Sequence, residues 1–169
     1  MFLRLLFIIL IIFTNSCSKK EEKVSIIKEK EINLQMIDAY KEGVEAFEQG
    51  DVLFAAKKFN EAEILFPQSE WASKSILMAA YSYYSQDYYY DAISELERFI
   101  QKYPNHKRLN YAHFLLAICY YEQIVDEKKD LGPLLNAQEE FKFVIKNYPD
   151  SDFALDSKFK LDLINDVLA

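Results

Sequence analysis

Three segments of the chain share one pattern of apolar and polar positions. In each segment a small residue is followed four places later by a large apolar residue, and eight places after that by a proline with an aromatic residue before it. The marks are Ala55, Phe59 and Pro67 in the first copy, Ala92, Leu96 and Pro104 in the second, and Ala137, Phe141 and Pro149 in the third. All three marks move together by 37 residues and then by 45. Such rigid shifts identify the chain as a repeat protein.

Each copy predicts one helix of about four turns. Residues four apart lie on the same face of a helix, so the small and the large residue share a stripe. The alanine allows a neighbouring helix to approach closely, and the proline ends the helix. The pattern therefore places Ala92 at a helix contact and places Ala72, near the start of the preceding helix, off the stripe.

A second amphipathic segment precedes each copy, so each repeat is expected to be a helix–turn–helix unit, with its helices called A and B in chain order. A period near 34 residues with small, large and proline marks is typical of tetratricopeptide repeats. The predicted fold is all-α: a tetratricopeptide-repeat solenoid of about seven helices, three repeats plus one extra helix. The helices are predicted at residues 32–49, 52–66, 70–85, 88–102, 108–126, 134–147 and 152–167, with the extra residues of the third repeat at 126–133.

The N-terminus differs from the rest of the chain. A short charged start leads to the apolar run Leu5–Phe13, which is too short to span a bilayer and indicates a secretory signal. The small polar residues between this run and Cys17 resemble the end of a bacterial lipoprotein signal, in which the cysteine is acylated. We expect a signal peptide at residues 1–16, a lipid anchor on Cys17, and a flexible tether at residues 17–31 before a repeat domain at residues 32–169. The alternative is an ordinary signal that leaves Cys17 as a free thiol.

Composition and charge exclude several classes of function. The net charge is −7 and no basic face is visible, so nucleic acid is not an expected partner. Cys119 is expected to be a small buried apolar residue, and helical glutamates such as Glu95 and Glu140 are expected to be solvated. His106 and His113 are expected about 10 Å apart on one helix, too far to share a metal ion. No catalytic residue, metal or cofactor is therefore predicted, and the chain is not expected to be an enzyme.

The remaining candidate site is a surface for binding other molecules. In tetratricopeptide stacks the A helices line a concave groove, and counting back from the prolines gives twelve groove positions, of which only Lys74 is charged and the others, Ile37 among them, are aromatic or aliphatic. Ten of the apolar ones are the candidate site. They are Tyr40, Val44, Phe47, Leu77, Tyr81, Tyr84, Tyr111, Phe114, Ile118 and Tyr121. About two-thirds of them are expected to be accessible and to mark a partner site. Because these positions carry almost no charge, binding there is predicted to depend little on salt.

The leader, the tether and two repeats that end in Tyr-Pro followed by Asn or Asp resemble the BamD family of outer-membrane protein assembly lipoproteins. Asp38-Ala39-Tyr40 opens the first repeat as in that family. The run YAHFLLAICYYEQIVDEKKD, residues 111–130, resembles its third-repeat helix and insertion, and YPDSDFALDSKFKL, residues 148–161, resembles the connection into its fourth repeat. Family members continue through a fourth and a fifth repeat, whereas this sequence stops after the first helix of the fourth.

The resemblance implies a non-enzymatic scaffold of the outer-membrane β-barrel assembly machinery, held by its lipid anchor on the periplasmic face of the outer membrane. The implied partners are BamA, other subunits of the machinery, and the extended C-terminal strand of unfolded outer-membrane proteins. The alternative is a periplasmic tetratricopeptide adaptor of cell-wall synthesis or cell division, which an unmodified N-terminus near residue 17 would favour.

Overall fold

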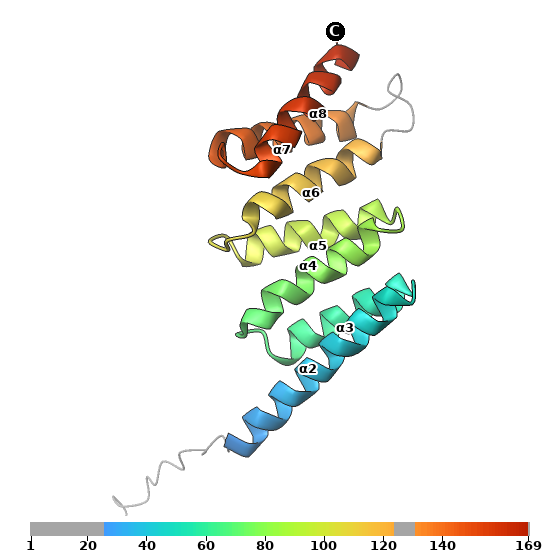
Figure 1. Ribbon diagram of the computed structural model, residues 1–169, viewed down its shortest axis with the longest axis vertical. Coiled ribbons are helices and arrows are strands. Elements are labelled where there is room, and N and C mark those ends of the chain that lie inside the picture. Colours follow the sequence, from blue (N-terminus) through green and yellow to red (C-terminus); the bar gives the residue numbers. More distant parts are fainter. Residues whose placement is uncertain (1–25, 124–130, 169) are drawn as a thin grey trace, which may run out of the picture. The chain divides into compact units, whose positions relative to one another are not determined.

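The computed structural model describes residues 26–123 and 131–168, with side chains from Lys30 onwards (Figure 1). Every regular element in these ranges is an α-helix. The helices are α2 (Ile26–Glu48), α3 (Val52–Leu65), α4 (Glu70–Tyr84), α5 (Tyr89–Lys102), α6 (Leu109–Glu122), α7 (Gly132–Asn147) and α8 (Asp152–Leu168). The predicted all-α fold of about seven helices is therefore confirmed.

The chain divides into two units, Met1–Glu31 and Ile32–Ala169. Helix α2 begins at Ile26, so residues 26–31, which the sequence predicted as the end of a flexible tether, are helical. Lysine and glutamate fill most of this stretch, and both favour helix. The predicted signal peptide at residues 1–16, the lipidated Cys17 and the tether up to residue 25 lie outside the described residues, as do residues 126–130 of the predicted insertion.

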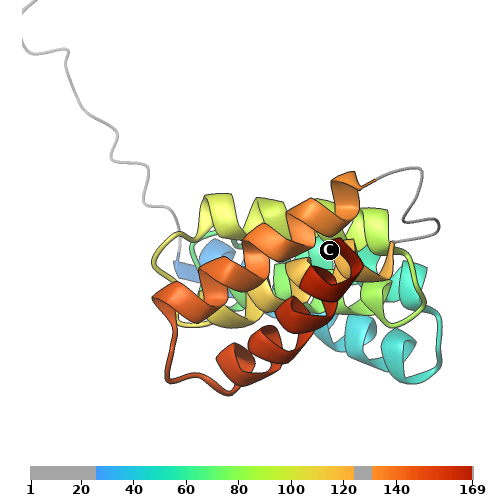
Figure 2. The ribbon, with the colours of Figure 1, turned by 90° about the horizontal axis from the view of Figure 1, so that it is seen from above.

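Within the unit that begins at Ile32, each helix packs against the next one in the chain. Helices α2, α4, α6 and α8 are the A helices, and α3, α5 and α7 are the B helices. Contacts join α3 to α4, α4 to α5, α5 to α6, α6 to α7 and α7 to α8, and α6 also meets α8. Seen from above, α5 and α7 lie on one side of the stack and α8 on the other (Figure 2). This alternation is the helix-pair packing that the repeat marks predicted.

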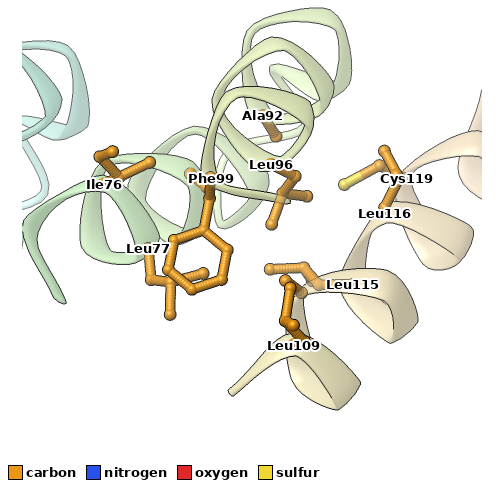
Figure 3. Packing of buried hydrophobic residues seen from close by; sticks show 11 residues of the cluster. Ile76, Leu77, Ala92, Leu96, Phe99, Leu109, Leu115, Leu116 and Cys119 are labelled. Atoms are coloured by element: carbon orange, nitrogen blue, oxygen red, sulfur yellow. The ribbon is translucent and has the colours of Figure 1, made fainter. Parts of the chain in front are cut away.

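The repeat marks are the centre of the core. The six alanine and large apolar marks of the three copies have no exposed surface. In the second repeat, Ala92 and Leu96 of α5 pack between Ile76 on α4 and Leu116 on α6 (Figure 3). In the first repeat, α2 approaches α3 so closely that a Cβ atom on Gly43 would lie 2.9 Å from the Phe59 ring. A side chain at residue 43 therefore competes directly with this ring for space.

The A–B turns of the first two repeats use the same geometry. Gly50 and Asp87, which are 37 residues apart, are the turn residues with positive φ, 81° and 63°. In both turns this residue donates its N–H to a carbonyl of the preceding helix, from Gly50 to Phe47 at 3.0 Å and from Asp87 to Tyr84 at 3.1 Å. A left-handed residue after the last helical turn is a common helix end, which glycine adopts without strain and aspartate tolerates.

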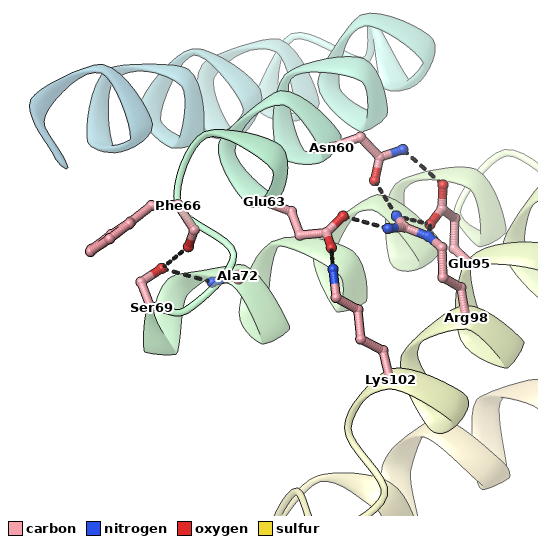
Figure 4. Close-up of polar contacts among 8 residues, drawn as sticks. All are labelled: Asn60, Glu63, Phe66, Ser69, Ala72, Glu95, Arg98 and Lys102. Atoms are coloured by element: carbon pink, nitrogen blue, oxygen red, sulfur yellow. Dashed lines mark hydrogen bonds and ion pairs between the residues drawn. The ribbon is translucent and has the colours of Figure 1, made fainter. Parts of the chain in front are cut away.

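A buried carboxylate joins the first two B helices. Glu63 on α3 is only 2% exposed and pairs with Arg98 and Lys102 of α5 (Figure 4). Arg98 also donates to Asn60 at 2.8 Å and to Glu95 at 2.9 Å, and Asn60 donates to Glu95 at 2.7 Å. Glu95 is half-buried in this network, so the prediction that it is solvated is wrong. The marks that identify the repeat pattern are apolar and do not reveal such a polar contact between repeats.

Replacing Ala92 by tyrosine should lower the free energy of unfolding by about 1–3 kcal/mol, because the fully buried site has no room for a ring. Ala72 is also fully buried, so the sequence-based expectation that it lies off the contact is wrong and it cannot serve as a control. Ser94→Tyr is the matched control, since Ser94 is exposed on the same helix. Equal midpoints for the two variants in urea unfolding would contradict the assignment of Ala92 to the interface.

Candidate functional site

The structure separates the ten predicted groove residues by exposure. Tyr40, Leu77 and Ile118 are buried, with 9%, 5% and 8% of their surface exposed. Tyr81 is exposed at 39%, and the other six are half-buried. The three buried residues belong to the core and cannot offer a full side chain to a partner.

Residues of the following A helix cover Tyr40. The Trp71 ring lies edge-on to the Tyr40 ring with 5.0 Å between their centroids. The Lys74 ammonium lies 5.1 Å from the Tyr40 centroid and 4.8 Å from that of Trp71, close enough for cation–π attraction to both rings. Tyr40 therefore supports the side chains that do reach the surface, Trp71 and Lys74.

These side chains border a hollow of about 910 Å³, which we call the α4–α6 hollow. It is lined by α4 from Glu70 to Tyr81 and the residues just before this helix, by the connection from α5 to α6, and by the start of α6. Of the ten predicted groove residues, Leu77, Tyr81 and Tyr111 line it. The other lining residues are Gln68, Ser69, Glu70, Trp71, Ser73, Lys74, Met78, Tyr103, His106, Lys107 and Arg108.

The α4–α6 hollow carries several charges, so the prediction of a groove with almost no charge is wrong. Lys74, Lys107 and Arg108 are exposed cations on its wall, against the single carboxylate of Glu70. Counting groove positions along the A helices missed Lys107 and Arg108, because both precede α6 in the connection that follows Pro104. The basic run at residues 106–108, directly after a repeat-ending proline, is the sequence signal that could have revealed them.

The histidine in this wall is neutral at physiological pH. His106 was predicted to share a helix with His113, but it lies in the connection before α6. Its ring is edge-on to Phe99 at 5.2 Å, and its Nε2 is 3.3 Å from the Ser73 hydroxyl. Burial, together with the positive charges of Lys107 and Arg108, lowers the pKa of His106. The positive character of the hollow therefore comes from the lysines and the arginine.

The remaining predicted residues belong to two aromatic groups, the first of which includes Tyr81 at the hollow. In the first group, the ring centroid of Phe47 is 5.7 Å from that of Tyr81, Tyr81 is 6.2 Å from Tyr84, and Tyr84 is 6.3 Å from Tyr89. The second group packs around α8: Phe114 lies 5.1 Å from Phe153 and 6.2 Å from Phe141, and the Lys160 ammonium lies 4.3 Å from the Tyr121 centroid. Val44 packs against the core of the first repeat.

Reactive side chains elsewhere are structural. Cys119 is fully buried, as predicted, and burial raises the pKa of its thiol to about 12. His113 on α6 is 2.7 Å from Glu140 on α7, so Glu140 is paired rather than solvated. In residues 26–123 and 131–168, no cluster of His, Cys, Asp and Glu is arranged to hold a metal ion. None of the helices described there combines the length and the apolarity that a membrane crossing requires.

The fold defines the class of protein. The tetratricopeptide-repeat domain of Arabidopsis OM64 superposes on this chain with a TM-score of 0.58, covering 78% of this chain and 97% of that domain at 12% identity. This likeness shows the fold alone: the chain is a tetratricopeptide-repeat protein of helix pairs stacked in chain order.

Sequence comparison then gives the family. The family model described as "YfiO: Outer membrane lipoprotein" matches residues 33–169, and the chain belongs to this family. It is 36% identical over 153 residues to the outer membrane protein assembly factor BamD of Caulobacter vibrioides, covering 90% of this chain and 49% of that protein. It is 32% identical over 130 residues to BamD of Rickettsia prowazekii, covering 77% of this chain and 52% of that protein. The chain thus spans about half the length of these relatives.

Proposed function

We propose that this chain is a non-enzymatic scaffold in the assembly of outer-membrane proteins, anchored through acylated Cys17 at the periplasmic face of the outer membrane. Its partners are then BamA, other subunits of the assembly machinery, and extended segments of unfolded barrel proteins. Membership of a family whose relatives are named assembly factors supports this role over that of a cell-wall or division adaptor. The mass of the mature N-terminal peptide tests the anchor, since an unmodified Cys17 would contradict it.

The α4–α6 hollow is the observation that carries the peptide-binding part of this proposal. The rings of Trp71, Tyr81 and Tyr111 offer stacking area for an aromatic side chain. Lys107 and Arg108 on the same wall offer charge-assisted hydrogen bonds to a carboxylate. The ligand that uses both is the C-terminus of an extended strand whose last residue is aromatic.

A peptide with such a terminus should bind the full chain in non-ionic detergent, and binding should weaken as salt is raised because cations contribute. Tyr81→Ala and Arg108→Gln should each raise the Kd about tenfold, as loss of a hot-spot side chain commonly does. Amidation of the peptide C-terminus should have a similar effect, because it removes the carboxylate. Titration followed by fluorescence anisotropy measures all three changes.

Two controls separate the hollow from the rest of the surface. Tyr90→Ala removes an exposed tyrosine outside the hollow, and Lys142→Ala removes an exposed cation on α7. Neither should change the Kd. If the amidated peptide binds like the free acid and Tyr81→Ala binds like the unaltered chain, the peptide binds elsewhere and the hollow is not the site.

A further inference from the structure

His106 fixes the backbone of the connection that carries Lys107 and Arg108. The Arg108 N–H donates to Nδ1 of the His106 ring at 3.2 Å. The backbone of His106 is bonded on both sides, because its N–H donates to the Tyr103 carbonyl at 3.0 Å and its carbonyl accepts from the Leu109 N–H at 3.1 Å. The two cations therefore stand in a turn between α5 and α6 that has His106 as its common partner.

The hydrogen bonds of the His106 ring define its protonation. Nδ1 can accept from the Arg108 N–H only when it carries no proton, so the proton of the neutral ring is on Nε2. Nε2 lies 3.3 Å from the Ser73 hydroxyl oxygen, which accepts from it and donates its own proton to the Glu70 carbonyl at 3.1 Å. Burial and the charges of Lys107 and Arg108 lower the pKa of His106 and keep the ring in this form. A chain of hydrogen bonds thus joins α4 to the connection.

Both ends of this chain of hydrogen bonds rest on well-packed parts of the molecule. Ser73 is only 5% exposed on α4. The His106 ring is edge-on to Phe99 of α5, with 5.2 Å between the ring centroids, and Phe99 has no exposed surface. The ring therefore transmits the positions of α4 and α5 to the Arg108 backbone. It is not free to bind a carboxylate itself, because its one N–H is already donated to Ser73.

We propose that His106 is a positioning residue of the α4–α6 hollow, which sets where Lys107 and Arg108 meet the carboxylate of a bound peptide. The inference rests on the proposed function, in which these two cations bind the C-terminus. Lysine and arginine side chains lose much conformational freedom when they bind a ligand, and a fixed backbone reduces that cost. Recognition of the carboxylate then depends on a side chain that does not touch it.

The ratio of the Kd of the amidated peptide to the Kd of the free acid tests this role, since it measures recognition of the carboxylate. Both peptides, which end in an aromatic residue, are titrated against the full chain in non-ionic detergent. His106→Asn keeps an acceptor for the Arg108 N–H, because an asparagine side chain bonds the backbone two residues on. His106→Leu keeps apolar bulk against Phe99 but has no acceptor. The ratio should stay near that of the unaltered chain in His106→Asn and should fall severalfold in His106→Leu.

Two further variants follow the path of the effect. Ser73→Ala removes the acceptor of the Nε2–H and should lower the ratio in the unaltered chain, but not in His106→Asn, which does not use it. Arg108→Gln should lower the ratio in the unaltered chain and change it little in His106→Leu, where Arg108 is already misplaced. A loss of folded chain lowers the active fraction for both peptides alike, so it leaves the ratio unchanged.

The outcomes separate the role of His106 from the proposed function. A ratio in His106→Leu equal to that of the unaltered chain, or a ratio in His106→Asn as low as that in His106→Leu, would overturn the role of His106 and leave the hollow as the peptide site. Equal binding of the two peptides to the unaltered chain would instead contradict carboxylate binding in the hollow, and with it both proposals.

Discussion

Replacing Phe59 by alanine should lower the free energy of unfolding by about 3–5 kcal/mol, as large-to-small changes at fully buried phenylalanines do. Phe59 has no exposed surface, its ring is 5.2 Å from that of Tyr40, and it fills the space opposite Gly43. The cavity would lie at the contact between α2 and α3, which is the centre of the first repeat. Urea unfolding followed by circular dichroism measures the loss.

Two further variants show whether the loss comes from this cavity. Phe54→Ala removes an exposed ring of the same helix and should change stability by about 0.5 kcal/mol or less. Gly43→Ala should destabilise the unaltered chain, because its Cβ would press on the ring, yet it should stabilise Phe59→Ala by up to about 1 kcal/mol through helix propensity. If Gly43→Ala has the same effect in both backgrounds, the two residues do not share this space.

The fold could be predicted because its signals are local. Ala55 and Phe59 are four residues apart on one helix, and the proline eight places after Phe59 ends that helix whatever other helices it packs against. Helix α3 does end at Leu65, two residues before Pro67. The start of α2 was harder to predict, since the stretch before Ile32 holds no residue type that stops a helix.

The site could be predicted only in part, because exposure depends on contacts between repeats. Tyr40 and Tyr81 stand at groove positions of successive A helices, yet Trp71 covers the first and the second stays accessible. Two of the three cations of the hollow, Lys107 and Arg108, come from a connection and not from a helix, so helical periodicity says nothing about them. Repeat position predicts which side of a helix a residue takes, but the neighbouring repeat decides whether a ligand can reach it.

Polar contacts between repeats are the least predictable part of the structure, and the network around Glu63 allows the sharpest test. Replacing both Arg98 and Lys102 by methionine should lower the free energy of unfolding by about 3–5 kcal/mol at neutral pH, because it leaves a buried carboxylate without a partner. Methionine keeps much of the apolar stem of both side chains, so lost packing contributes little. The matched control replaces Lys57 and Lys142, two exposed lysines outside α5, by methionine and should change the free energy of unfolding little.

The pH dependence of this loss identifies its cause. Burial by itself raises the pKa of Glu63, but the hydrogen bonds from Lys102 and Arg98 outweigh it and hold the pKa below its usual value. In the unaltered chain this stabilisation is therefore present at neutral pH and is lost as the pH falls through the carboxylate range. In the double variant only burial remains, which raises the pKa and favours the protonated acid. The difference in free energy of unfolding between the double variant and the unaltered chain should therefore shrink on acidification. Adding Glu63→Gln to the double variant should restore part of its stability at pH 7. A deficit that is the same from pH 7 to pH 5 and unaffected by Glu63→Gln would show that the unpaired carboxylate is not its origin.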